Sequence, residues 1–173
     1  MSTPQPTKPA KLVIGLFMKN RNLLAPLARR LIDAYGGLDL VSAWIPFGYT
    51  DYYEPEMGAP LFRRMLSFRS LVSQDALADI KTETNRLESG YIEDGARRVN
   101  IDPGYLLPER FVLASGKNFT HRISIGRGIY ADLTLIYTKG DFQTLPWTYP
   151  DYADPRMIAF LRQVRDRYVH AVT

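Results

Sequence analysis

Three polar residues are spaced so that a helix would carry them on one face. Lys81, Asn85 and Glu88 stand at positions i, i+4 and i+7, which at about 100° per residue lie within about 60° of one another. Leu77 and Thr84 border this face and are expected to point inward, so the polar groups would sit at the edge of the core. A solvated lysine–glutamate stripe that supports the helix has the same spacing, and the spacing does not separate it from a ligand-binding stripe.

A second polar set is expected on one face of a strand over residues 97–102. Side chains alternate between the two faces of a strand, so Arg98, Asn100 and Asp102 share a face. A guanidinium, an amide and a carboxylate together form either a ligand-binding platform or an ordinary solvent-facing surface. We expect Pro103-Gly104 to make a tight turn that holds Asp102 at the end of the strand.

Cationic side chains gather before and within a predicted hairpin. Lys117, His121 and Arg122 are suited to binding a phosphate or a carboxylate, and Asp132 lies on the second hairpin strand. His121 is also a candidate general acid or base, because imidazole changes its charge near neutral pH. Asp51 is the second acid–base candidate. A structural histidine is the alternative to a catalytic one.

Two segments rich in aromatic residues, over residues 48–58 and 147–152, are expected to be ordered loops. Their rings could line a pocket for a flat or sugar-like ligand, or they could simply pack the loops against the rest of the protein. The candidate ligand contacts within these segments are Tyr52, Trp147 and Asp151.

The composition limits the chemistry that is available. The chain of 173 residues has no cysteine and two histidines, which excludes thiolate catalysis, disulfides, zinc ribbons and iron–sulfur clusters and argues against a multi-histidine metal site. Asp51, Glu56, Asp102 and Asp132 could hold Mg²⁺, but no D-x-D-x-D spacing supports this. We therefore predict no metal-ligating residue and leave the cofactor open.

The overall composition is typical of a globular protein, with 46% hydrophobic and 23% charged residues. No apolar run approaches the roughly 18–20 residues of a membrane span, and residues 1–10 lack the apolar core of a secretory signal. We therefore expect a cytoplasmic protein with a flexible tail over residues 1–10 and a single α+β domain over residues 11–173.

Half of the net charge of +4 falls between residues 154 and 173, where four arginines accompany two aspartates. The four arginines are Arg156, Arg162, Arg165 and Arg167. A basic helix can contact nucleic acid, although such a charge run is ordinarily a solvated face. Together with the aromatic loops it gives the alternative function, a non-catalytic protein- or RNA-interaction module. The predicted sheet lacks the aromatic pattern of RNA-binding sheets, which disfavours nucleic acid.

The order of the predicted elements indicates a ferredoxin-like fold. Hydrophobic periodicity predicts a strand, a helix, two strands, a helix and a strand. These are expected at residues 12–18, 25–35, 38–47, 61–72, 74–88 and 97–102. The βαββαβ order is that of an antiparallel sheet with both helices on one face. A short strand over 111–114, a β-hairpin over 121–138 and a C-terminal helix that begins at Asp154 extend this core.

The same segments resemble a known family. The matching strings are Pro46-Phe47-x-Tyr49-Thr50-Asp51-Tyr52-Tyr53, Glu56-Met57-Gly58, Lys81-x-x-x-Asn85-x-x-Glu88, Arg97-Arg98-Val99-Asn100-Ile101-Asp102-Pro103-Gly104-Tyr105, Lys117 with His121-Arg122, Gly128-Ile129-Tyr130 and Trp147-Thr148-Tyr149-Pro150-Asp151. Over about residues 11–168 the sequence resembles a bacterial family catalogued as domain of unknown function 4416, with Asp132 where we expect the family's glutamate. The family brings no established activity, so the resemblance implies that these residues belong to one pattern.

Together these observations predict one polar cleft for an anionic ligand, either phosphorylated or nucleotide-like. The predicted anion clamp is Arg98, Lys117 and Arg122. The predicted orienting groups are Asn85, Glu88 and Asp102. No phosphate loop and no G-x-S-x-G elbow is present, so any catalysis would be general acid–base or metal-assisted hydrolysis or transfer. A third interpretation is a buried polar network that fixes the geometry of the loops. The oligomeric state is left open.

Overall fold

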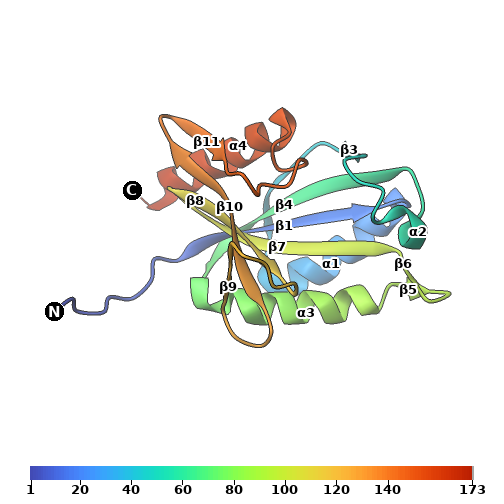
Figure 1. Cartoon of the computed structure of the whole chain (residues 1–173), viewed down its shortest axis with the longest axis horizontal. Coiled ribbons are helices and arrows are strands. Elements are labelled where there is room, and N and C mark those ends of the chain that lie inside the picture. The colour runs from blue at the N-terminus through green and yellow to red at the C-terminus, as the bar shows by residue number, and fades with distance from the viewer. Residues whose placement is uncertain (173) are drawn as a thin grey trace.

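An antiparallel sheet of nine strands forms the centre of the computed structural model, which describes residues 1–172 (Figure 1). The spatial order is β11-β10-β8-β7-β1-β4-β2, with β3 paired to β4 and β9 paired to β10. The strands are β1 (Ala10–Met18), β2 (Leu38–Val41), β3 (Ile45–Phe47), β4 (Leu61–Val72), β7 (Val99–Leu107), β8 (Arg110–Ser115), β9 (Arg122–Ser124), β10 (Tyr130–Thr138) and β11 (Asp141–Thr144). The helices are α1 (Leu24–Tyr35), α2 (Glu54–Met57), α3 (Leu77–Ser89) and α4 (Pro155–Val172). The fold is therefore α+β, as the sequence predicts.

β1 is the buried central strand that the sequence predicts. It pairs with β4 on one side and with β7 on the other, and all nine of its residues are buried. Leu12, Ile14 and Leu16 pack with side chains of α1 and α3, whereas Val13 packs with side chains of α4. A strand that is covered on both faces needs apolar residues at nearly every position, which explains the unbroken apolar run.

Helices cover both faces of the sheet. α1 and α3 lie on one face and α4 lies on the other (Figure 1). α4 buries Met157, Leu161, Val164 and Tyr168, at spacings of three or four residues that keep apolar side chains on one side of a helix. The apolar spacing of this segment predicts inward positions at Ile158, Leu161, Val164 and Tyr168. The last three are buried, and Ile158 is partly buried against the same cluster.

β7 continues through the turn that was expected at Pro103-Gly104. The strand extends to Leu107 and pairs with β8 from Gly104 onward. Glycine is needed there, since a Cβ at this position would come 2.5 Å from the carbonyl oxygen of Val112. The prediction of a turn was wrong because proline is tolerated where a strand has a free edge, and glycine where a neighbouring backbone comes close.

Smaller elements also differ from the expectations. The strand expected over residues 38–47 is divided into β2 and β3, and the loop expected over 48–58 contains α2. A hairpin of β5 (Ile92–Glu93) and β6 (Ala96–Arg97) precedes β7, and β11 pairs with β10 beyond the predicted hairpin. The sheet is therefore larger than the core and hairpin that the sequence predicts.

The N-terminal segment extends away from the sheet (Figure 1). Residues 1–9 contain no helix or strand and are exposed, and β1 begins at Ala10, the last residue of the predicted tail. Across residues 1–172, no helix has both the length and the apolar character needed to cross a membrane.

Candidate functional site

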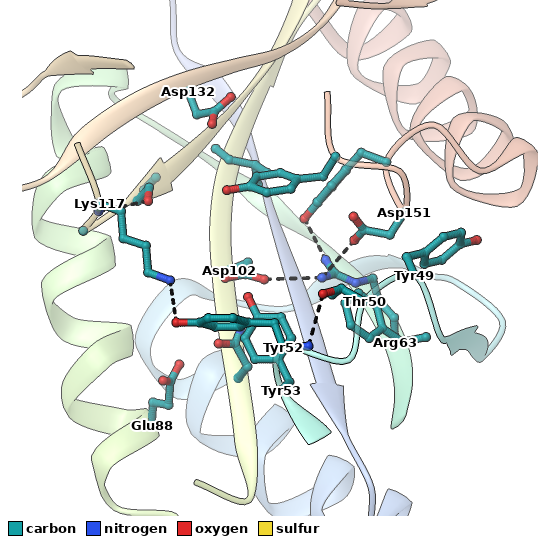
Figure 2. Close-up of a pocket in the computed structure, with 18 of the residues that line it drawn as sticks. Tyr49, Thr50, Tyr52, Tyr53, Arg63, Glu88, Asp102, Lys117, Asp132 and Asp151 are labelled. Carbon is teal, nitrogen blue, oxygen red and sulfur yellow. Dashed lines mark hydrogen bonds and ion pairs between the residues drawn. The ribbon is translucent and has the colours of Figure 1, made fainter. Parts of the chain in front are cut away.

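A pocket of about 730 Å³ lies where β7 and β8 separate. Within the described residues, β8 pairs with β7 through residues 104–107 alone. Residues 99–103 of β7 therefore have no neighbouring strand on that side. α3 lies along this free edge, and the loops at residues 49–53 and 149–152 lie over the pocket (Figure 2). Small-molecule sites commonly occupy roughly 300–1,000 Å³, so the pocket has a suitable size.

Most of the predicted site residues line this pocket. They are Tyr52, Lys81, Asn85, Glu88, Asn100, Asp102, Lys117, Asp132 and Asp151. In Figure 2, Glu88, Asp102, Lys117 and Asp151 surround one space although they come from distant parts of the chain. The tertiary structure therefore brings together a helix stripe, a strand face and two loops that are separate in the sequence.

Lys81 and Glu88 join α3 to the free edge of β7. The Lys81 ammonium donates to the carbonyl oxygen of Ile101 at 2.8 Å, and the Glu88 carboxylate accepts from the N–H of Ile101 at 2.9 Å. Both side chains are buried, whereas Asn85 between them is exposed. The two ends of the stripe are therefore not solvated; they satisfy backbone groups that a neighbouring strand would otherwise pair.

Arg63 of β4 occupies what we call the inner end of the pocket, together with Asp102, Asp151 and Tyr152. Its Nη1 donates to the Tyr152 hydroxyl at 2.9 Å, and its Nη2 lies 3.0 Å from Asp151 Oδ2 and 3.5 Å from Asp102 Oδ2 (Figure 2). Burial alone would lower the pKa of the guanidinium, but Tyr152 and the two carboxylates outweigh it and raise the pKa overall. Arg63 stays charged because its neighbours compensate it.

The carboxyl of Asp151 is poorly solvated. Burial raises its pKa, the nearby Arg63 opposes this effect, and the second carboxylate at Asp102 adds to it. Burial also raises the pKa of Tyr152 and raises the pKa of Tyr53 to about 12. The inner end thus combines neutral hydroxyl groups with a carboxyl that binds a proton more readily than an ordinary aspartate.

Several buried polar atoms at the pocket lack hydrogen-bond partners. Among residues 1–172, buried side-chain atoms without a partner include Arg63 Nε, Asn100 Nδ2 and Asp151 Oδ2, and all three belong to pocket-lining residues. Asp151 Oδ2 lies close to Arg63 as an ion pair, without the geometry of a hydrogen bond. Buried polar groups in folded proteins are nearly always paired, so these atoms favour a place where a ligand or water completes the hydrogen bonding.

Two cations join the aromatic loop to the pocket walls at what we call the mouth. Arg97 donates to both carboxylate oxygens of Glu56, each at 2.7 Å, and to Glu88 at 2.8 Å. The Lys117 ammonium donates to the Tyr52 hydroxyl at 3.0 Å and lies 4.5 Å from the centroid of its ring (Figure 2). These hydrogen bonds lower the pKa of Glu56 and of Tyr52. The loop over residues 48–58 is thus held by cations that also line the pocket.

Arg122, which was expected to belong to the anion clamp, does not line the pocket and links structural elements beside it. Its Nε donates to Asp132 at 2.8 Å, and its Nη1 donates to Ser115 Oγ at 3.2 Å and to the Lys117 carbonyl oxygen at 2.9 Å. Its guanidinium also donates to the Tyr149 hydroxyl. Arg122 therefore holds two segments of the pocket wall, and four of its five N–H donors are occupied.

His121 and Trp147 pack together beside this link. The His121 Nε2 lies 3.2 Å from Asp132 Oδ2, and its ring stacks on Trp147 with centroids 5.0 Å apart. Neither residue is among those that line the pocket. These contacts suit the structural role that was the alternative to catalysis for His121.

Two further predicted residues lie away from the pocket. Arg98 is exposed and pairs with Glu93 at 2.7 Å, while the preceding Arg97 lines the pocket. The expected alternation fails because β7 begins at Val99, after a separate hairpin. Asp51 is exposed and is not among the lining residues, although both of its neighbours in the sequence are.

Other lining residues were not named individually as ligand contacts, although the tyrosines among them belong to the two aromatic segments whose rings were expected to line a pocket. They are Phe47, Tyr49, Thr50, Tyr53, Arg63, Arg97, Leu113, Ala114, Ser115, Gly116, Tyr149, Pro150 and Tyr152. A signal for Arg63 was present, since it stands between the buried residues Leu61 and Met65 at an inward position of a strand. A charged residue at a core position needs compensation and often marks a functional site. No comparable signal separates Arg97 from Arg98.

The candidate Mg²⁺ ligands are not brought together. Within the 172 described residues, no group of three or more Asp, Glu or His side chains is placed to hold a metal ion. Glu56, Asp102 and Asp132 each pair with a different arginine, and Asp51 is exposed.

The arginines of α4 bind other parts of the same chain. Arg162 pairs with Asp141 at 2.6 Å and Arg167 pairs with Asp39 at 3.1 Å, while Arg165 donates to a backbone carbonyl oxygen at 2.7 Å. A helix whose cations are already paired offers less charge to an outside partner. This arrangement weakens the alternative of an interaction module based on α4.

Comparison with known proteins identifies the family to which the chain belongs. No curated protein and no solved structure is significantly similar to the chain. A family model, however, matches residues 8–168, which include every residue that lines the pocket. The chain therefore belongs to the family described as domain of unknown function (DUF4416).

Proposed function

We propose that the protein binds a small anionic, phosphorylated molecule in the pocket between α3, β7 and the two loops. The observation that carries this proposal is the position of Lys117 at the mouth. Its ammonium contacts the hydroxyl and the ring of Tyr52, and no carboxylate pairs with it in the described part of the chain. An ammonium with spare donors beside a pocket is a suitable partner for a phosphate group.

The remaining charges of the lining largely neutralise one another. Arg63 is paired with two carboxylates at the inner end, and Arg97 is paired with Glu56 and Glu88. Lys81 lies 3.9 Å from Asp102. Lys117 is therefore the lining cation that we assign to the ligand, in place of the clamp of three that the sequence suggested.

The aromatic rings at the mouth support the same proposal. Tyr52 is 62% exposed, Tyr149 is 44% exposed and Tyr49 is 37% exposed, and all three line the pocket. Exposed rings at a pocket offer flat apolar surfaces on which a ligand ring can stack, while their hydroxyls provide hydrogen bonds. A ligand with both a ring and a phosphate would use these tyrosines and Lys117 together.

We also infer that the strands nearest α1 and α3 derive from a ferredoxin-like core. The chain order β1, α1, β2, β4, α3, β7 and the spatial order β7-β1-β4-β2 support this inference, because the split βαβ arrangement places its strands in the order fourth, first, third and second. β8 to β11 and α4 would be additions to that core.

A thermal-shift series tests the proposed function. We expect inorganic phosphate and ribose 5-phosphate to raise the unfolding midpoint, since a ligand that binds the native state stabilises it, and free ribose to raise it less. Lys117→Ala should weaken the response to ribose 5-phosphate by about tenfold in half-saturating concentration. Lys8→Ala, which removes the same charge from the exposed N-terminal segment, is the matched control. The proposal fails if no phosphorylated compound shifts the midpoint or if the two variants respond alike.

A further inference from the structure

The inner end of the pocket carries an acceptor that lacks a donor. Asp151 is 7% exposed, and its Oδ2 makes an ion pair with Arg63 but receives no hydrogen bond from any described residue. Asp102 lies across the same guanidinium nitrogen and is partly exposed. Two carboxylates therefore line one small region, and at least one of their oxygens is ready to accept a hydrogen bond from a ligand.

Two residues before Asp102 on β7, Asn100 carries a donor that lacks an acceptor. Asn100 is 6% exposed and lines the pocket, and its Oδ1 accepts from Arg97 at 3.2 Å. This bond fixes which end of the amide is the oxygen, and it leaves Nδ2 buried without a partner among residues 1–172. A ligand group that donates to the carboxylates and accepts from the amide would satisfy both sides.

Charge decides which chemical group suits this region. Arg63 and Lys81 lie close to Asp102 and Asp151, so two cations balance two carboxylates. A phosphate or carboxylate would meet two like charges, and an ammonium would upset the existing balance. A hydroxyl is neutral, donates one hydrogen bond and accepts others.

We infer that the inner end recognises two adjacent hydroxyl groups of a sugar ring whose phosphate binds Lys117. This inference rests on the proposed function and narrows its ligand class to phosphorylated sugars that keep a vicinal diol. Free sugar phosphates and ribonucleotides share this chemistry. Asp102 and Asp151 accept from the hydroxyls, and Asn100 donates to one of them.

Titration calorimetry with matched pairs of compounds tests the inference. Ribose 5-phosphate is compared with 2-deoxyribose 5-phosphate, and AMP with 2′-deoxy-AMP, with inorganic phosphate as the reference. We expect the compound with the diol to bind about tenfold more tightly than its deoxy partner, as the loss of a hydrogen bond to a charged group predicts. The pair in which removal of the hydroxyl weakens binding more identifies the natural ligand as a free sugar phosphate or as a nucleotide.

Variants assign the effect to the inner end. Asp151→Asn should reduce the preference for the diol to less than about twofold while the deoxy compounds bind as before. Asp141→Asn, at a half-buried acidic position that does not line the pocket, should keep the full preference. If Asp151→Asn does not fold, as judged by circular dichroism, Asn100→Ala replaces it with the same expectation.

The possible outcomes separate the two proposals. Equal affinity within both pairs, or a diol preference that survives in Asp151→Asn, overturns the inference and leaves phosphate binding in place. Absence of binding by every phosphorylated compound, inorganic phosphate included, overturns the proposed function and the inference together.

Discussion

At the scale of single residues, Arg63 determines the chemistry of the inner end. The aromatic rings of Phe17 and Phe47 lie 5.2 Å and 5.1 Å from its guanidinium carbon, in addition to its two carboxylate partners. Gly15 of β1 leaves the necessary room, since a Cβ at that position would come 2.9 Å from Arg63 Nη1. Burial of this cation is tolerated because rings and carboxylates replace the lost water. Its removal would therefore leave Asp151 buried without compensation.

We expect Arg63→Met to lower the free energy of unfolding by about 3–5 kcal/mol, the usual cost of removing one partner from a buried ion pair. Arg64→Met is the matched control on the same strand. Arg64 is half-buried over Trp44. We expect Arg64→Met to lower the free energy of unfolding by less than about 1 kcal/mol. Urea unfolding measures both values. A similar loss in the two variants would contradict the assigned role of Arg63.

The raised pKa of Asp151 predicts a dependence of stability on pH. Burial is the main cause of the rise, and the aspartate of an unfolded chain titrates near pH 3.9. Because the folded protein holds this proton more tightly, the contribution to stability is present below about pH 3.9 and is lost as pH rises through the folded-state pKa.

We therefore expect wild type to lose stability relative to Asp151→Asn over this range, and the difference to become constant at higher pH. Urea unfolding from about pH 3 to pH 7 measures the two profiles. Parallel profiles would show that folding does not raise the pKa of the Asp151 carboxyl.

At the scale of elements, the loop over residues 48–58 is positioned by an ion pair, a hydrogen bond and a small apolar cluster. Met57 and Phe47 pack in a small cluster with Phe17, and Arg97 reaches the loop through Glu56. Lys117 reaches it from the other side through Tyr52. Loops with few buried contacts open at low free-energy cost, so we expect these polar contacts to affect how readily the loop moves.

We expect Glu56→Gln to loosen this loop without unfolding the protein. Exposed ion pairs contribute about 0.2–1 kcal/mol, so the amides of α2 should exchange with solvent about two- to fivefold faster. Hydrogen–deuterium exchange of the peptide that covers residues 50–58 measures the change. Glu54→Gln, on the same short helix and exposed, should leave the exchange unchanged. Equal acceleration in the two variants would mean that charge, and not the link to Arg97, sets the mobility.

At the scale of the whole molecule, two apolar layers hold the sheet between helices. The side chains of α4 and those of α1 and α3 belong to separate clusters on opposite faces. The pocket lies where β7 and β8 part, between α3 and the loop at residues 149–152 that precedes α4. The arginines of α4 contact the rest of the chain mainly at exposed positions, so apolar burial provides most of the docking energy of this helix.

We expect Leu161→Ala to lower the free energy of unfolding by about 2–5 kcal/mol, because Leu161 is fully buried and the substitution leaves a cavity. Arg162→Ala, one residue along the same helix, should cost less than about 1 kcal/mol, because its pair with Asp141 is exposed. Chemical denaturation of the two variants measures the comparison. A larger loss for Arg162→Ala would mean that α4 is docked by charge.

The sequence by itself determined the elements and much of the polar lining. The apolar run of β1 predicts a buried strand, and apolar residues at every third or fourth position predict the helices α1, α3 and α4. Burial on one or both faces requires those patterns. The stripe from Lys81 to Glu88 was likewise visible as one helical face. Pro103-Gly104 was misjudged, since local turn chemistry cannot show that a strand has one free edge and one close neighbour.

Only the tertiary structure decided which cations face the pocket. The sequence contains the adjacent pairs Arg63-Arg64 and Arg97-Arg98, and one member of each pair lines the pocket. A shift of one residue in a strand moves a side chain to the opposite face, so the choice depends on where pairing with neighbouring strands begins. Register is fixed by contacts between residues far apart in the chain, and a pattern of residue types along one segment does not contain them.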